Sequence, residues 1–311
     1  MSWLMRASEE QKQERDRLTW SAWGANLTLE QFCRRERVLR AHPWAVHGMN
    51  TWLWVDESGA VLSSCESFAC TSVFRGLWAR SYAIASVFTE EKLRGQGHAS
   101  RMMDALVLEI RRHDPLAHAV VLYSDVGKAL YERSGFLGLP AWDVELDPCE
   151  GDVMEGVDEL LPELVPELPP PPAEEPFVIW PDRHQMDWHR ARERFYGDVL
   201  GRARSLSCGA RVGRSQIYWT ADFKQEQLLV LLVTEPEWKA LERLLVAARR
   251  MAHRLRLTRV LLWEDASLAP FLAGLSGARR RPRHGALPMI LPLQEGLRPE
   301  EWRLRSRALW V

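Results

Sequence analysis

The segment RGQGHA, residues 94–99, carries two glycines two residues apart directly after an arginine. The run before it (81–88) predicts a strand, and the amphipathic run after it, at about 98–112, predicts a helix. Uncovered backbone N–H groups at a helix start bind phosphate, because the helix dipole favours negative charge there. The segment therefore predicts a phosphate-binding loop, to which Arg94 adds a charged fork. A tight strand-to-helix turn without a ligand is the alternative.

Two nucleotide-binding motifs are excluded at this loop. The Walker motif needs GK followed by serine or threonine, which is absent, and the glycine spacing does not match GxGxxG.

The loop lies within a first half whose patterns predict alternating strands and helices. Thr28, with Gln31 three residues later, predicts a capping box at one helix start. The predicted elements are a strand at 3–7, helices at about 8–22 and 28–41, a hairpin around the turn DESG, a strand at 81–88, a helix at about 98–112, a strand at 117–124, a helix at 126–134 and a strand from Phe136.

The clearest boundary in the chain is the acidic segment 147–176, which ends in four consecutive prolines followed by AEEP. Proline runs cannot form a helix interior or a central strand, so this segment predicts an extended, semi-rigid linker. The predicted domains are therefore 1–146 and 177–311.

The second half repeats the order of elements found in the back part of the first. Its predicted elements are a helix at 183–200, a hairpin made of RSQIYWTADF and EQLLVLLVT, a helix in EPEWKALERLLVAARRMAHRL, a strand in TRVLLWE, a helix at about 266–274 and a strand in ALPMILPL. The two halves together predict an α+β fold with mixed β-sheets.

Composition narrows the class of partner. The 311 residues contain 41 Lys plus Arg and 42 Asp plus Glu, so no net field favours nucleic acid or a membrane surface, and a small soluble partner is expected. Five cysteines without a CxxC pair indicate neither a disulfide framework nor a zinc site. The early charges at the N-terminus and the absence of a long apolar run predict a cytoplasmic protein.

A second motif joins the loop. The signature R-x-x-G-x-A (Arg94, Gly97, Ala99), followed by a strand and ALYERSGF at 129–136, resembles the GNAT superfamily of acyl-CoA N-acyltransferases. This resemblance covers about residues 1–146 and implies a GNAT fold, acetyl-CoA as cosubstrate and no metal. With IWPDRHQMDWHRARERFY opening the second half, the chain resembles more closely the fungal lysine N6-acetyltransferases and their bacterial relatives. Those proteins pair a catalytic GNAT domain with a degenerate GNAT-like one.

The resemblance also implies roles for single residues. It assigns the pantetheine arm to the end of the preceding strand, the pyrophosphate to the loop amides, and Tyr131 to a place near the thioester sulfur. Ser124 stands where many members have asparagine. The residues expected to bind the cofactor are Val87, Phe88, Thr89, Arg94, Gly95, Gln96, Gly97, His98, Ala99 and Ser124.

The corresponding junction of the second half reads VTEPEWKALERLL and has no glycine. We therefore expect no second acetyl-CoA there. We expect this half to supply part of the acceptor site, with a packing role alone as the alternative.

Acetyl transfer to an amine needs a base, because the lysine side chain has a reference pKa of about 10.4. Glu90, Glu91 and Asp125 are candidates, although each fits a solvated loop carboxylate as well. Tyr131 could protonate the thiolate, with a packing tyrosine as the alternative. An arginine of RARERF (190–195) could bind a substrate carboxylate, with a solvated helix face as the alternative.

The sequence thus predicts an acetyl-CoA-dependent N-acetyltransferase acting on a small amine, with the side chain of free L-lysine favoured by the family resemblance alone. The alternatives are a GNAT enzyme acting on another amine, such as an antibiotic or a protein lysine, and a non-catalytic acyl-CoA sensor. Two pseudo-equivalent halves in one chain predict a monomer or a weak dimer.

Overall fold

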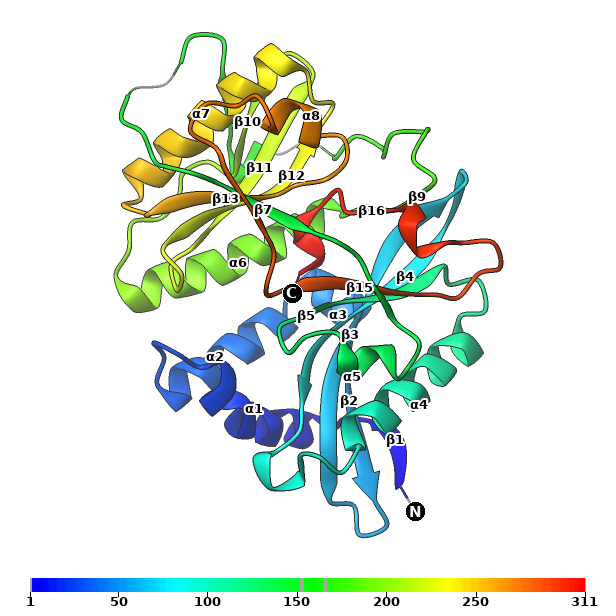
Figure 1. Ribbon diagram of the computed structural model, residues 1–311. Helices are drawn as coiled ribbons and strands as arrows, with labels where there is room; N and C mark the ends of the chain where they lie inside the picture. Colours follow the sequence, from blue (N-terminus) through cyan, green and yellow to red (C-terminus); the bar gives the residue numbers. More distant parts are fainter. Residues whose placement is uncertain (1, 152–153, 165–166, 311) are drawn as a thin grey trace.

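The computed structural model of the protein describes residues 2–151, 154–164 and 167–310. Parts of the predicted linker, residues 152–153 and 165–166, lie outside the described residues. Two mixed β-sheets stand one above the other in Figure 1, each flanked by helices, which confirms the predicted fold class.

The first sheet carries the phosphate-loop region. Its strands are, in spatial order, β1 (Ser2–Arg6), β2 (Met49–Asp56), β3 (Val61–Phe74), β4 (Leu77–Phe88), β5 (Ala119–Ser124), β15 (Leu287–Pro292) and β6 (Leu137–Gly138), while β9 (Phe177–Ile179) pairs with β3, and β16 (Trp302–Arg303) with β9.

The second sheet belongs mainly to the second half. Its strands are, in spatial order, β14 (Arg279–Pro282), β7 (Trp142–Leu146), β13 (Arg259–Trp263), β12 (Gln227–Thr234), β11 (Ser215–Asp222), β10 (Gly209–Val212) and β8 (Asp158–Leu160). Strand β8 lies within the predicted linker, so that segment is not extended spacer throughout.

The two halves exchange strands. β7 follows the first sheet in sequence but pairs with β13 and β14 of the second sheet. β15 makes the opposite crossing, because it lies between β5 and β6 of the first sheet. Figure 1 shows both crossings: the green strand β7 runs up to the upper sheet, and the chain descends from there to the orange-red strand β15 in the lower one. The two sheets are therefore tied together by the chain itself.

The helices cover the sheets and fill the space between them. Their bounds are α1 (Glu9–Trp23), α2 (Leu29–Arg40), α3 (Pro43–Gly48), α4 (His98–His113), α5 (Ala129–Glu132), α6 (Arg183–Leu200), α7 (Trp238–Arg254) and α8 (Ala269–Leu272). The predicted capping box of Thr28 and Gln31 is confirmed at α2, and α6 has its predicted bounds. The short helix α3 was not predicted.

Helix α6 joins the two cores. Its Trp188 packs among the buried side chains of the first sheet, and its Phe195 and Tyr196 pack among those of the second. On the other face of the first sheet, α4 buries an apolar stripe that includes Met102, Leu106 and Ile110. Each such side chain contributes roughly 1.5–3 kcal/mol when fully buried, so α4, and with it the loop at its start, is held firmly against the sheet.

Candidate active site

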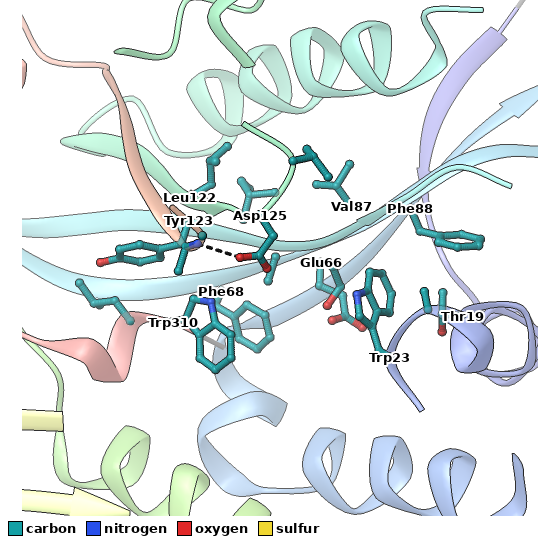
Figure 2. A pocket seen from close by; sticks show the side chains of 18 of the residues that line it. Thr19, Trp23, Glu66, Phe68, Val87, Phe88, Leu122, Tyr123, Asp125 and Trp310 are labelled. Carbon is teal, nitrogen blue, oxygen red and sulfur yellow. Dashed lines mark hydrogen bonds between the residues drawn. The ribbon is translucent and has the colours of Figure 1, made fainter. Parts of the chain in front are cut away.

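A cavity of about 1010 Å³ lies between the two halves. Its walls come from α1 and α2, the ends of β4 and β5, the loop before α4, and several strands of the second sheet. Figure 2 shows side chains of the first half gathered around it, together with Trp310 from the C-terminal segment.

The cavity opens where two parallel strands part. β4 and β5 pair from Tyr82 with Val120 to Ile84 with Leu122, and no pair continues beyond that point. At their last residues, β4 and β5 therefore do not pair with each other, and the backbone groups on their facing edges stay available. An extended ligand arm can lie in such a gap and use those edges.

A β-bulge stands at this gap. Two residues of β4, Ser86 and Val87, oppose the single residue Cys65 of β3, and Ser86 adopts a positive φ of 52°. A bulge leaves its extra residue outside the ladder and re-aims the local backbone. Arg15 fixes it in place, since its Nη2 donates to the Ser86 carbonyl at 2.8 Å.

The predicted phosphate loop has the geometry of an anion site. Gly95 and Gly97 have φ angles of 77° and 76°, which favour glycine. Gly97 caps α4 without any side-chain bond, so the first N–H groups of the helix lack a side-chain acceptor there. Arg94 donates from Nε to the Thr89 carbonyl at 3.1 Å. Ser100, one turn into α4, carries a buried hydroxyl without a partner among the described residues.

Most of the predicted cofactor residues face this cavity. The predicted residues that line it are Val87, Phe88, Thr89, Arg94, Gly95, Gly97, Ala99 and Tyr131. Gln96, His98 and Ser124 are not among the lining residues. Ser124 instead shapes the turn before α5, where its hydroxyl donates to the Gly127 carbonyl at 2.5 Å and accepts from the Val126 N–H at 3.3 Å.

Tyr131 lies on α5, beside the open ends of β4 and β5. It is buried, and its ring packs edge-on against Phe136 at 6.2 Å between centroids. Burial raises the pKa of Tyr131 to about 12. The phenol therefore keeps its proton at neutral pH and is able to donate it.

Sequence reasoning missed one buried carboxylate in the cavity. Glu66 of β3 lines it on the α1 side, as Figure 2 shows, and burial raises the pKa of Glu66 although Arg15 opposes that change. The sequence did not single out Glu66 as a functional residue, because several polar residues stand before and after it in the same predicted strand.

The three carboxylates proposed from sequence have different surroundings. Glu90 forms an exposed ion pair with Lys92 at 3.0 Å and does not line the cavity, and neither does Glu91. Asp125 lines the cavity, and its Oδ1 accepts a hydrogen bond from the backbone N–H of Ala286 at 2.7 Å (dashed in Figure 2).

The second half forms the opposite wall. Within RARERF, Arg190 is buried and Arg192 lines the cavity, so the helix face is not solvated at these positions. The lining residues of the second sheet and the C-terminal segment include Asp222, Lys224, Arg259, Trp263, Arg281, Arg283, Arg307 and Trp310. The wall is therefore rich in guanidinium groups.

Among the described residues no cluster of three or more His, Cys, Asp or Glu could hold a metal ion. In the same part of the chain no helix is long and apolar enough to cross a membrane.

A family model and a known protein are similar to this chain in sequence. The family model for the LYC1 GNAT-like C-terminal domain matches residues 152–303. A protein of Yarrowia lipolytica named lysine acetyltransferase is 22% identical, with 78% of this chain and 79% of the relative covered.

Solved structures share the fold at low identity. A conserved Enterococcus faecalis protein of unknown function has a TM-score of 0.59 at 10% identity and covers 94% of this chain and 72% of its own. A GCN5-related N-acetyltransferase from Anabaena variabilis has a TM-score of 0.58 at 12% identity, covering 94% of this chain and 73% of its own.

The chain shares its fold with a solved GCN5-related N-acetyltransferase, and its residues 152–303 match the GNAT-like family model. With the relative named lysine acetyltransferase, these similarities support an enzyme of the GNAT acetyltransferase type.

Proposed function

We propose that this protein transfers the acetyl group of acetyl-CoA to the side-chain amine of free L-lysine. One observation carries the proposal: the uncapped glycine loop, the parted ends of β4 and β5, and Tyr131 all open into one cavity. In this proposal residues 1–146 bind the cofactor and residues 177–311 complete the acceptor site across a linker at 147–176.

Acetyl-CoA fits the cavity by the chemistry of its parts. The amides at 97–100 and the Arg94 guanidinium suit the pyrophosphate. The free edge of β4 at Val87 and Phe88 suits the amide-bearing pantetheine arm. In this proposal, backbone N–H groups at the bulge of Ser86 bind the carbonyl oxygen of the thioester, where negative charge develops during attack.

The reaction then needs two proton movements. Glu66 takes the proton from the ammonium or from the attacking amine, for which its raised pKa makes it a better base than an exposed glutamate. The amine nitrogen bonds to the carbonyl carbon, and the carbon–sulfur bond breaks. Tyr131 gives its proton to the departing thiolate, and solvent restores it.

Two observations support free lysine as the acceptor. A relative named lysine acetyltransferase favours lysine, and the second wall, formed by the second half, favours a small molecule over a protein surface. Another amine, such as an antibiotic or a protein lysine, remains the alternative acceptor. A non-catalytic acyl-CoA sensor would have no use for a buried, protonated Tyr131 next to the open strand ends.

A thiol-release assay with the purified full chain tests the proposal. Acetyl-CoA is supplied with L-lysine, D-lysine, ornithine, cadaverine, an aminoglycoside and a lysine-containing peptide. We expect CoA release to be fastest with L-lysine. Release with none of these amines, despite measured acetyl-CoA binding, would favour the sensor, and faster release with the peptide or the aminoglycoside would replace the acceptor.

A further inference from the structure

Two arginines converge at the second-half end of the cavity. Arg283 follows β14, and Arg307 lies in the short 3₁₀ helix at Arg307–Leu309. Their guanidinium carbons lie over the Trp263 ring, 3.8 Å and 4.6 Å from its centroid. The ring of Tyr123, at the end of β5, is 4.8 Å from that of Trp263 between centroids. We call these four residues the arginine cluster, and all of them line the cavity.

The arginine cluster has hydrogen-bond donors without acceptors. Arg283 is 6% exposed and Arg307 is 7% exposed. Among the described residues no acceptor meets Nε or Nη2 of Arg283, Nε of Arg307 or the Tyr123 hydroxyl. Buried donors are normally paired, because an unpaired one loses its water without compensation. Several unpaired donors at one place therefore point to an acceptor that binds there.

The charges at the arginine cluster favour an anionic acceptor. Around Arg307, three guanidinium groups (Arg192, Arg283 and Arg307 itself) face two carboxylates (Asp143 and Asp222). Arg283 lies 3.3 Å from Asp143 between Nε and Oδ1, but the two atoms are not aligned for a hydrogen bond. Burial lowers the pKa of Arg283 and of Arg307 to about 10, so both stay charged at neutral pH.

We propose that the arginine cluster binds the carboxylate of the acceptor amino acid. This inference rests on the proposed function and specifies the acceptor: an amine whose far end carries a free carboxylate. A guanidinium fork matches a carboxylate in shape and in charge. The aromatic rings of Trp263 and Tyr123 hold the two forks in place and exclude water from the ion pair.

The cluster would also explain a choice between acceptors. In a protein, the lysine carboxyl group is part of a peptide bond and carries no charge. Binding such a lysine would leave the buried donors of Arg283 and Arg307 without an acceptor and their excess positive charge unbalanced, which opposes it strongly. The same argument makes diamines that lack a carboxylate weaker acceptors than L-lysine.

Arg307→Gln is the variant that tests the cluster. It removes one charge, whereas an Arg283 variant would also lose the bond from Arg283 Nη1 to the Ala286 carbonyl at 3.2 Å. The matched control is Arg279→Gln, because Arg279 lies nearby on β14 and forms an exposed ion pair with Asp147 outside the cavity. Circular dichroism checks the fold, and Arg307→Lys replaces Arg307→Gln if the latter unfolds.

Kinetics with two acceptors give the first result. L-lysine carries the carboxylate, and cadaverine is the same chain without it. For Arg307→Gln we expect kcat/KM to fall about 10- to 100-fold with L-lysine, through KM, as for a lost charge-assisted hydrogen bond. With cadaverine it should change by less than about twofold on the same reasoning. Arg279→Gln should resemble the wild type. An equal fall with both acceptors, or none with L-lysine, would overturn the inference.

Calorimetry gives the second result without turnover. The wild type should bind L-lysine more tightly than cadaverine, and Arg307→Gln should bind the two alike while keeping the wild-type Kd for acetyl-CoA. Weaker acetyl-CoA binding with unchanged lysine binding would assign the cluster to a cofactor phosphate and reject our proposal. Carboxylate-dependent binding of L-lysine without acetyl transfer would reject the proposed function alone. Wild-type binding that ignores the carboxylate would reject the inference alone.

Discussion

Arg15 and Glu66 form a buried ion pair at the edge of the cavity, with Nη1 2.9 Å from Oε1 and both side chains 6% exposed. The same guanidinium donates to the Ser64 hydroxyl at 3.0 Å and to the Ser86 carbonyl in the bulge. One residue of α1 thus fixes both the proposed base and the proposed carbonyl site.

Glu66→Gln should lower kcat by about 10² to 10⁴, the usual size of a general-base contribution. The amide can still accept from Arg15, so the fold should persist. Because burial raises the pKa of Glu66, wild-type kcat/KM should rise with pH through a value above that of an ordinary glutamate, as the base loses its proton. This rise, which forms the acidic limb of the pH profile, should disappear in the variant.

The control for this experiment is Glu14→Gln, an exposed carboxylate on the same helix as Arg15 that pairs with Arg17. It should leave rate and pH profile unchanged. A Glu66→Gln enzyme with the wild-type acidic limb would remove Glu66 from the mechanism.

Tyr131→Phe should lower kcat by about 10² or more with little change in the KM for acetyl-CoA, because it removes a proton donor used in the transition state. The pKa of Tyr131, raised to about 12, keeps the phenol protonated through the working range. Tyr82→Phe is the control, since the Tyr82 hydroxyl donates to Asp114 and the residue does not line the cavity. Steady-state kinetics in which both variants match the wild type would return Tyr131 to a packing role.

Gly97→Asp should weaken acetyl-CoA binding at least about tenfold, because it adds a carboxylate where the helix N-terminus favours an anionic ligand. Gly59→Asp is a control with similar strain: Gly59 has a φ of 81°, and no atom lies within 4 Å of an added Cβ. Calorimetric titration with acetyl-CoA separates the two. Equal affinity in both variants would remove the phosphates from this loop.

The exchanged strand β15 should contribute to the free energy of unfolding of the protein. Ile290 of β15 is fully buried in the first sheet between β5 and β6. Ile290→Ala should lower the free energy of unfolding by about 2–5 kcal/mol, and Val46→Ala, at an exposed position, by less than about 0.5 kcal/mol. Denaturant titration measures both.

A truncated chain of residues 1–176 lacks β15, and we expect it not to unfold cooperatively. If it melts cooperatively and binds acetyl-CoA, the exchanged strand is dispensable to the first sheet.

Local signals predicted much of this structure. The glycines at 95 and 97 need positive φ, and the capping box at Thr28 depends only on residues three apart, so both could be inferred from neighbouring residues. The proposed role of Tyr131 was inferred from the eight-residue motif ALYERSGF.

Non-local pairing could not be inferred in this way. The pattern of β15 fits a strand in either sheet, and its pairing with β5 joins segments more than 160 residues apart. Glu66 has the pattern of a solvent-exposed hairpin residue in the sequence. In the structure its side chain is buried under α1, because Arg15 of that helix donates a hydrogen bond to it. Arg283 and Arg307 are separated in the sequence by 24 positions, and only the fold brings both to Trp263.

Identification of the product tests the central claim most directly. The purified full chain is incubated with acetyl-CoA and L-lysine, and the product is assigned by NMR and mass spectrometry, with CoA counted in parallel. We predict N6-acetyl-L-lysine and free CoA in equal amounts, and no product when acetyl-CoA is left out. Acetylation at the α-amine, or no acetylated lysine from a protein that binds acetyl-CoA, would contradict the account.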